Sequence, residues 1–250
     1  SPSMLPTEII LRLTSGKTIL YPLTIPEGYR ITEIASLLDT QGLANSEVFI
    51  LQTQDKDLIK SMDIPTDSLE GYLFPETYYL SKLTPEKKIV QKMVNTFKEK
   101  VLKSQLLKST KESPLSLHEI ITLASLIEKE TGLDSERKLI SSVFHNRLRK
   151  NMRLQTDPTV IYAIEKFDGN IRKRDLKIDS PYNTYRYKAL PPGPISSPGI
   201  KSIEAAIFPI KSNHLYFVSR QDGSHHFSST LVEHNQAVKK YQLRKVNSRR

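Results

Sequence analysis

The sequence lacks several patterns that would point to particular chemistries. It has no cysteine, which excludes disulfides, thiolate catalysis and cysteine-ligated zinc or iron–sulfur sites. Its 6 histidines include no HExxH pair or comparable spacing, so we expect no metal site. Neither GxGxxG nor the GxxxxGK loop of nucleotide-binding proteins occurs, and no Ser-His-Asp arrangement stands out. We therefore expect no cofactor.

Long apolar runs are also absent. No stretch approaches the roughly 18 residues needed to cross a bilayer, and no signal peptide is recognisable. Among the 250 residues, 38% are hydrophobic and 26% charged, which is typical of a soluble globular protein. The net charge of +10 favours an anionic partner, such as nucleic acid, a membrane surface or an acidic cell-wall polymer. Basic residues do not interleave with aromatic ones as in RNA-binding sheets, so we expect no nucleic acid.

Hydrophobic periodicity predicts an α+β fold that is mostly helical. Residues 69–80, LEGYLFPETYYL, are predicted to form an extended, packed segment because they combine four aromatic residues with a proline. A polar stretch near residues 55–68 predicts a boundary between a small αβ module, residues 1–60, and a larger domain, residues 61–245. The other predicted elements are a strand over 18–25, helices over 31–42, 45–54, 84–105, 116–132, 134–151, 157–167, 201–208 and 230–242, and a hairpin over 214–229.

Two glutamates lie one residue apart in the otherwise apolar stretch TLASLIEKETG, residues 122–132. Successive helix residues rotate by about 100°. This rotation puts Glu130 about 50° and Glu128 about 110° from the centre of the apolar face. Most glutamates near a helix end point to water. The alternative is a carboxyl in an apolar pocket, where desolvation raises its pKa as a general acid in glycosidic cleavage requires.

Arg147 lies within the apolar stripe of the next predicted helix. A buried arginine needs a partner because an isolated charge is costly to desolvate. Glu128, Glu130 and Asp157 are candidate partners, and the alternative is that the guanidinium reaches the surface. If Arg147 pairs with a carboxylate, Glu128 suits better, because a close cation would lower the pKa of an acid that must keep its proton.

Several motifs in fixed order carry a resemblance to a known family. They are EGYLFPETYYL, ASLIEKETG, SVFHNRLRKNMRLQTDPTVIYAI, SPYNTYRYKALPPGPISSPG, SIEAAIFP and LYFVSRQDGSHHFSSTLVEHNQAV. Over residues 68–240 the sequence resembles the endolytic murein transglycosylase family, also called YceG-like. Residues 1–54 resemble part of that family's LysM-like module. The resemblance implies a lysozyme-like catalytic domain behind a LysM-like module.

The resemblance also implies the reaction. The family cleaves the bond between N-acetylmuramic acid and N-acetylglucosamine within peptidoglycan strands and leaves a 1,6-anhydro end, which suits a terminator of strand elongation. Its catalytic glutamate matches Glu130 in EKET. One carboxyl can suffice, because it can protonate the leaving oxygen and then, as a carboxylate, accept the proton of the muramyl 6-hydroxyl.

Polar groups on loops after the helices are the predicted glycan contacts. These candidates are Gln155, Thr156, Asp157, Asn183, Tyr185, Pro192 and Gly193. Each has a structural alternative: Asp157, for example, is equally well placed to cap a helix. Glu128 and Arg147 are expected to support the site. His225 and His226 follow the hairpin turn, a position typical of solvated or groove-lining side chains.

The resemblance implies a single-pass inner-membrane protein whose catalytic domain faces the periplasm or cell wall, with an N-terminal membrane anchor outside this chain. Peptidoglycan glycan strands are the implied substrate, and the cell-wall synthesis machinery is the implied partner. Two alternatives stay open at this point. One is a hydrolytic muramidase of similar fold, which would need a second carboxylate, and the other is a non-catalytic wall-binding module.

Overall fold

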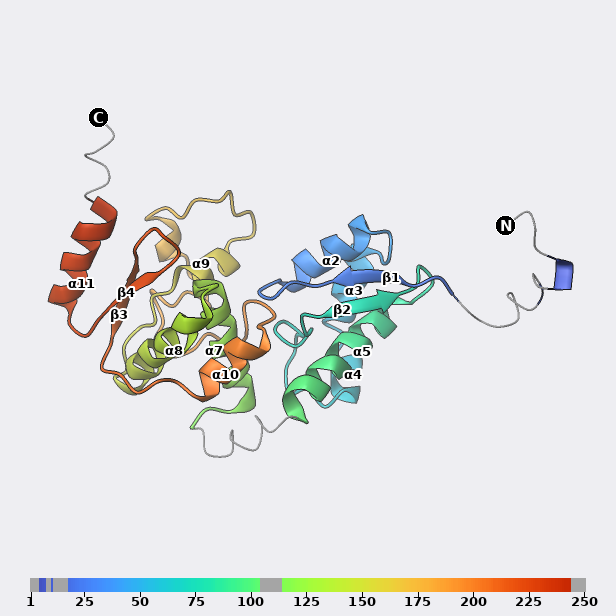
Figure 1. Cartoon of the computed structure of the whole chain (residues 1–250), viewed down its shortest axis with the longest axis horizontal. Helices are drawn as coiled ribbons and strands as arrows, with labels where there is room; N and C mark the ends of the chain where they lie inside the picture. Colours follow the sequence, from blue (N-terminus) through green and yellow to red (C-terminus); the bar gives the residue numbers. More distant parts are fainter. Residues whose placement is uncertain (1–4, 8–9, 11–17, 104–113, 244–250) are drawn as a thin grey trace.

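The computed structural model describes residues 5–7, 10, 18–103 and 114–243. The chain forms two lobes side by side, an N-terminal lobe of residues 18–103 and a C-terminal lobe of residues 114–243 (Figure 1). The fold is α+β, because each lobe combines helices with a two-stranded antiparallel sheet. Among the described helices, none is both long and apolar enough to cross a membrane.

The N-terminal lobe is built on one antiparallel strand pair. Strand β1, Tyr21–Thr24, pairs with β2, Thr77–Leu80, so that Leu23 lies opposite Tyr78 and both side chains are buried. The helices of this lobe are α2 (Ile31–Thr40), α3 (Ser46–Gln52), α4 (Lys56–Ser61) and α5 (Glu86–Phe97), which continues into the π-helical turn η1 (Lys98–Leu102).

Two features of this lobe differ from the sequence prediction. Residues 56–61 form α4 with Leu58 and Ile59 buried, although their polar neighbours indicated a separating segment. Residues 77–80 are a paired strand and not only an extended segment. Because β2 pairs with β1 and α5 packs on α3, the boundary predicted between residues 60 and 61 lies inside one sheet and one core.

The C-terminal lobe follows the predicted order of elements. They are α7 (Leu117–Glu130), α8 (Asp134–Arg149), α9 (Asp157–Ala163), the 3₁₀ turn η2 (Asp175–Lys177), α10 (Ile200–Ile207), β3 (Tyr216–Ser219), β4 (His225–Ser228), α11 (Leu231–Val238) and the π-helical turn η3 (Lys239–Leu243). The predicted hairpin is confirmed as β3 and β4. The helix predicted over 157–167 ends early, at Ala163. The end of the helix predicted over 84–105 lies outside the described residues.

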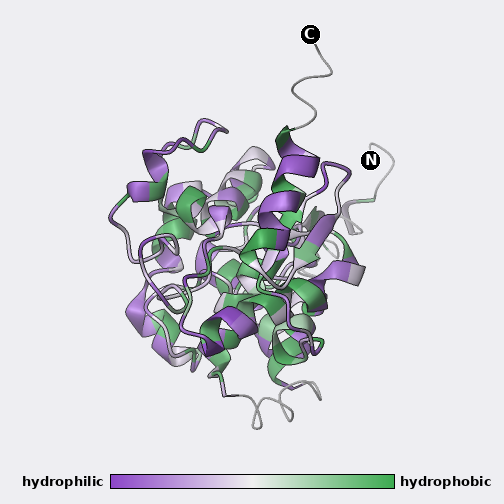
Figure 2. Ribbon diagram, turned by 90° about the vertical axis from the view of Figure 1, so that its left-hand side faces the viewer, coloured by the Kyte–Doolittle hydropathy of each residue, from purple (hydrophilic) through white to green (hydrophobic). Residues whose placement is uncertain are grey.

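Helix α7 lies at the centre of the hydrophobic core. The side chain of Ser116 accepts the N–H of Glu119 while Glu119 bonds back to Ser116, a capping box that fixes where the helix begins. Every residue from Ile120 to Ile127 is buried. The buried hydrophobic residues form one cluster that extends across both lobes. In Figure 2 the hydrophobic residues, in green, are concentrated in the interior of the molecule. Helices α8, α9 and α10 all pack on α7, so its last residue, Glu130, is held in a defined position.

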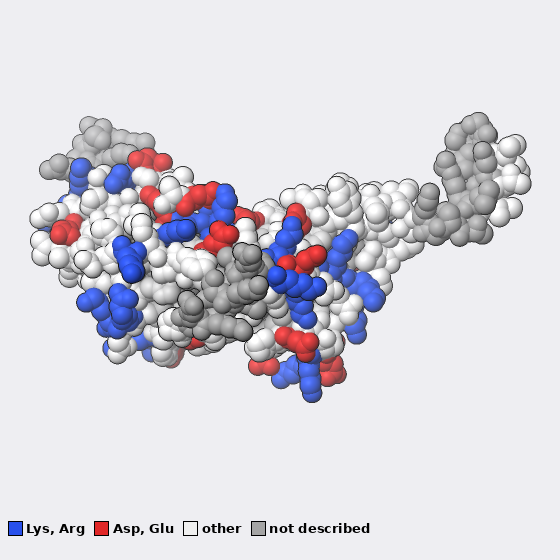
Figure 3. Space-filling view, turned by 60° about the horizontal axis from the view of Figure 1, so that its bottom comes forward, with Lys and Arg blue, Asp and Glu red and all other residues white. Residues whose placement is uncertain are grey.

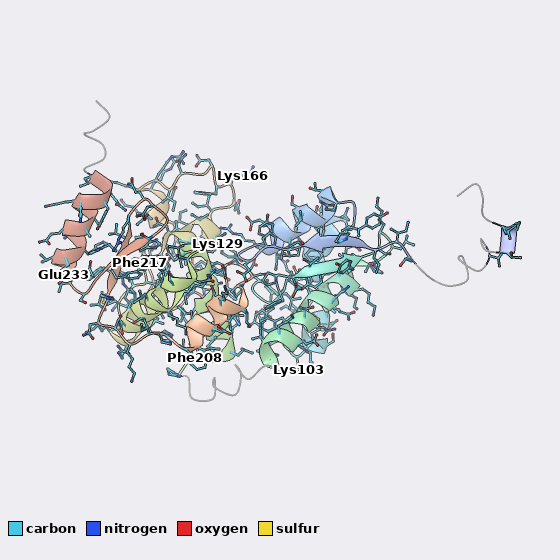
Figure 4. The ribbon with its side chains drawn as sticks, viewed as in Figure 1. Lys103, Lys129, Lys166, Phe208, Phe217 and Glu233 are labelled. Carbon is cyan, nitrogen blue, oxygen red and sulfur yellow. The ribbon has the colours of Figure 1, made fainter. Side chains whose placement is uncertain are left out.

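The lobes are joined where the loop before α2 meets the loop before α10. The N–H of Gly28 donates to the carbonyl of Ser197, and the N–H of Ser197 donates to the carbonyl of Tyr29, both at 2.8 Å. Lys129 on α7, labelled in Figure 4, donates to the carbonyl of Gly28 at 3.2 Å. The N-terminal lobe therefore contacts α7 one residue from Glu130.

Gly71 lies at a second contact between the lobes, and its replacement by alanine is expected to destabilise the protein. Gly71 has φ +83°, and a Cβ there would lie 2.4 Å from Cβ of Pro194. A left-handed conformation costs a non-glycine residue about 1–2 kcal/mol, and overpacking against a rigid ring adds about 1–3 kcal/mol. We expect Gly71→Ala to lower the free energy of unfolding by about 2–5 kcal/mol, measured by denaturant unfolding.

Gly42→Ala is the matched control. Gly42 also has a positive φ, +61°, but a Cβ added there meets nothing within 4 Å. Only the cost of the left-handed backbone remains, so Gly42→Ala should lower the free energy of unfolding by about 1–2 kcal/mol. Equal losses for the two variants would contradict the close packing of the lobes at Gly71.

Candidate functional site

Glu130 ends α7 and contacts the loop before α9. The hydroxyl of Thr156 donates to Oε1 of Glu130. Thr156 is itself fully buried, and its N–H donates to Oγ1 of Thr184 at 3.0 Å. The Glu130 side chain is partly buried. The structure thus sets one carboxyl in a defined orientation against Thr156, which is held in turn by Thr184 of another loop.

Burial raises the pKa of Glu130 to about 7. The hydrogen bond from Thr156 opposes this rise, because it favours the ionised form. The negative charge of Asp157 raises the pKa further, whereas the positive charges of His225 and Arg147 lower it. A carboxyl with a pKa near 7 can hold a proton and release it near neutral pH, which is what a group that acts first as acid and then as base requires.

Arg147 is buried, but it has no carboxylate partner within the described residues. Its Nε donates to the carbonyl of Leu215 at 2.6 Å, and its Nη1 donates to the carbonyl of Leu154 at 2.8 Å. The guanidinium lies 5.1 Å from the ring centroid of Tyr216. The pairing with Glu128 is therefore wrong, and so is the alternative of a guanidinium at the surface. Backbone carbonyls in two loops satisfy the buried cation instead.

Glu128 pairs with Arg137, which the sequence analysis did not single out. Nη2 of Arg137 lies 3.2 Å from Oε1 of Glu128, and both side chains are 6% exposed. The N–H of Gly199 donates to Oε2 of Glu128 at 3.0 Å. The flank of α7 to which rotation assigned Glu128 is thus covered by α8 and the loop before α10. Glu128 supports the end of α7, but through a different arginine from the predicted one.

Three predicted glycan contacts cluster near Glu130. Thr156 bonds to it directly, and Asp157 lies close enough to affect its pKa. Tyr185 donates its hydroxyl to Oδ1 of Asp157 at 2.5 Å. Asp157 does not cap α9, because Thr156 occupies the N-cap position and no side-chain cap bond forms. Gln155 is exposed and adopts φ +52°, and its Oε1 lies 3.4 Å from Nη1 of Arg147.

The other three predicted contacts lie elsewhere. Asn183 is fully buried, and its amide donates to the carbonyls of Leu176 and Ile178, so it holds the loop together. The carbonyl of Pro192 lies 2.9 Å from Nε2 of His118, in the first turn of α7. The 12 residues from His118 to Glu130 span about 18 Å along a helix. Pro192 and its neighbour Gly193 are therefore not at the Glu130 end of the helix.

The described residues contain no cluster of three histidine, aspartate or glutamate side chains that could hold a metal ion. The structure does bring together a pair that the sequence analysis missed. Glu136 at the start of α8 contacts His225 at the start of β4. These residues are 89 positions apart in the chain, so no local spacing could have revealed the pair.

Comparisons with known proteins agree with one another. Residues 1–240 match the profile of the YceG-like family. A Bacillus subtilis (strain 168) protein named endolytic murein transglycosylase is 39% identical over 93% of this chain and 69% of its own length. A protein of the same name from Streptococcus pneumoniae serotype 2 (strain D39) is 32% identical over 98% of this chain. This chain covers 50% of the streptococcal protein.

A solved structure is also similar. The crystal structure of a putative yceG-like protein from Listeria monocytogenes matches with a TM-score of 0.79 and 37% sequence identity. The match covers 94% of this chain and 82% of the Listeria chain.

Proposed function

Since the chain belongs to the YceG-like family, we propose that it is an endolytic murein transglycosylase that cleaves the glycan strands of peptidoglycan. The observation that carries the proposal is Glu130, a desolvated carboxyl with a pKa near 7 at the end of a rigid helix. The names of the bacillar and streptococcal relatives support it.

The proposed reaction needs only this one group. Protonated Glu130 donates its proton to the oxygen between N-acetylmuramic acid and N-acetylglucosamine while the bond from C1 to that oxygen breaks. The resulting carboxylate then accepts the proton of the muramyl 6-hydroxyl, whose oxygen bonds to C1. The product is a 1,6-anhydro end, no water is consumed, and Glu130 regains its proton. Thr156 orients the carboxyl in both steps.

The wider setting is part of the same proposal. Lysine and arginine side chains form patches on both lobes on the face shown in Figure 3, and the net charge of +10 suits an anionic wall polymer. We propose that the unit from β1 to β2 is LysM-like and binds glycan. The same proposal includes an inner-membrane anchor, partners in cell-wall synthesis and a role in ending strand elongation.

Analysis of the products by mass spectrometry tests the function. Purified peptidoglycan incubated with the protein should yield fragments that end in anhydro-muramic acid and come from within the strands. Fragments with reducing muramic acid would favour a hydrolase. Binding without cleavage would favour a wall-binding module.

One observation favours the hydrolytic alternative, because Asp157 supplies a second carboxyl near Glu130. Asp157→Asn separates the two mechanisms. Asparagine keeps the acceptor for Tyr185 and removes the charge that raises the pKa of Glu130. For a transglycosylase we expect kcat/KM at acidic pH to stay within about tenfold of the wild-type value, and the alkaline limb of the pH profile to move to lower pH. A loss of about a hundredfold or more would assign Asp157 a chemical role.

A further inference from the structure

One carboxylate holds both the ring and the backbone of His225. Nδ1 of His225 lies 2.7 Å from Oε2 of Glu136, and the backbone N–H of His225 donates to Oε1 at 2.8 Å. Glu136 lies in the first turn of α8, whereas His225 is the first residue of β4. The two contacts fix the position of the residue and the orientation of its imidazole.

The pairing leaves the other ring nitrogen available. A carboxylate has no proton to donate, so Nδ1 carries the proton in this hydrogen bond. Nε2 has no partner among the described residues, and it is not one of the fully buried polar atoms. The side chains of His225 and Glu136 are 12% and 11% exposed. The ring is thus nearly enclosed, with one nitrogen still open at its edge.

Another histidine of this lobe shows what a purely structural ring looks like here. Nδ1 of His118 lies 2.7 Å from the hydroxyl of Tyr72, and its Nε2 lies 2.9 Å from the carbonyl of Pro192. Both nitrogens of His118 are therefore satisfied within the protein. His225 differs because only one of its nitrogens is satisfied, although Phe217 and Phe227 both pack against its ring.

The open nitrogen belongs to a ring near Glu130, because Glu136, which holds the ring, follows Glu130 by six positions across the short turn between α7 and α8. The charge of His225 is near enough to affect that carboxyl, as are the charges of Asp157 and Arg147. The ring packs edge-on against Phe217 at 5.5 Å, and Phe217 in turn packs on Phe144 of α8 at 6.0 Å. Figure 4 labels Phe217 on β3 beside α8. The hairpin thus sets the imidazole on a rigid support against the first turn of α8, within electrostatic reach of the candidate acid.

We propose that His225 is a substrate-binding residue whose Nε2 hydrogen-bonds the sugar next to the bond that Glu130 cleaves, with Glu136 as its positioning residue. A neutral Nε2 accepts from a sugar hydroxyl, and a protonated one donates to an N-acetyl carbonyl. Both groups are abundant in peptidoglycan strands. The inference rests on the proposed function, because it names a further contact at the same site.

The rival interpretation is that the pair only ties the hairpin to α8. Two substitutions distinguish these roles, because they preserve different parts of the imidazole. His225→Asn keeps a polar group near the Nδ1 position, where Glu136 is, and has nothing at the Nε2 position. His225→Gln reaches the Nε2 position and loses the Nδ1 position. The neighbouring His226→Asn is the control, since successive strand residues point to opposite faces.

We expect His225→Asn to melt within about 2 °C of the wild type and to lose about tenfold or more in kcat/KM, the order of one lost hydrogen bond. His225→Gln should keep more activity than His225→Asn although it is less stable. His226→Asn should match the wild type in activity. Full activity of His225→Asn would overturn the proposal, as would activity that simply follows melting temperature across the three variants.

A binding measurement separates this inference from the proposed function. Purified glycan strands are titrated against Glu130→Gln with and without His225→Asn, so that no cleavage is needed. We expect the second substitution to weaken binding about tenfold. If the wild type does not cleave but the strands bind and His225→Asn weakens the binding, the proposed reaction fails and His225 stays a glycan contact. Equal binding by the two proteins, or no binding by either, overturns the inference.

Discussion

Glu130→Gln is expected to lower the rate of peptidoglycan cleavage by about 10²–10⁴-fold, the usual contribution of a general acid–base group. Glutamine keeps the shape of the side chain and an oxygen for the hydroxyl of Thr156. It has no proton to give to the leaving oxygen and cannot accept one afterwards. The loss should therefore fall on kcat, while binding of glycan strands stays close to that of the wild type.

Glu165→Gln is the control for this variant. Glu165 is exposed in the loop after α9. Its substitution by glutamine removes the same charge as Glu130→Gln but leaves the contacts of Glu130 intact. Its activity should equal that of the wild type. If Glu130→Gln kept full activity while Glu165→Gln was unchanged, Glu130 would not be the acid.

Stability gives a second, independent readout of Glu130. Its pKa is about 7 in the folded protein against 4.5 for an ordinary glutamate. The folded state therefore binds the proton more tightly, so the stability contribution is full below pH 4.5 and is lost as pH rises through about 7. Above that pH, Glu130→Gln should be more stable than the wild type by up to about 3 kcal/mol, at about 1.4 kcal/mol per pKa unit. At pH 4 the two proteins should unfold alike.

Arg147→Ala is expected to lower the free energy of unfolding by about 3–5 kcal/mol. The substitution leaves the carbonyls of Leu215 and Leu154 without their donor inside the protein, and it removes the cation over Tyr216. Hydrogen bonds to a charged group contribute about 1.5–3 kcal/mol each. Activity should fall as well, because Leu154 lies in the loop that leads to Thr156 and to Asp157, the first residue of α9. Thermal unfolding combined with the cleavage assay checks both effects.

Arg149→Ala provides the comparison. Arg149 is exposed in the same last turn of α8, and within the described part of the chain its side chain donates only to Asn146. Surface substitutions of this kind usually change stability by less than about 0.5 kcal/mol. If Arg147→Ala melted like Arg149→Ala, the buried carbonyl contacts would contribute little.

Local signals predicted much of the fold. The Ser116 and Glu119 pattern marks the start of α7, and the aromatic-rich strands around Asp222 and Gly223 mark the hairpin. Both depend on residues close together in sequence. Helix α4 was missed because its buried pair, Leu58 and Ile59, lies in an otherwise polar stretch.

Long-range pairing explains most of what the sequence did not reveal. Strand β2 needs β1, which lies more than fifty positions earlier, to become a strand. The boundary predicted near residue 60 therefore falls between two strands that belong to one sheet. A helical wheel separates Glu128 from Glu130 but does not say which loop covers each face. Arg137 and Gly199 reach Glu128 on α7 only through tertiary packing. The same is true of His225, which reaches Glu136 on α8.

The central claim is that Glu130 alone drives an intramolecular transfer in which water takes no part. Digestion of peptidoglycan in heavy-oxygen water tests it most directly, with mass spectrometry of the muramic acid ends. We predict ends that are lighter by one water than reducing ends and carry no heavy oxygen. Reducing ends that contain one heavy oxygen would contradict the account, because a water molecule would then have attacked C1.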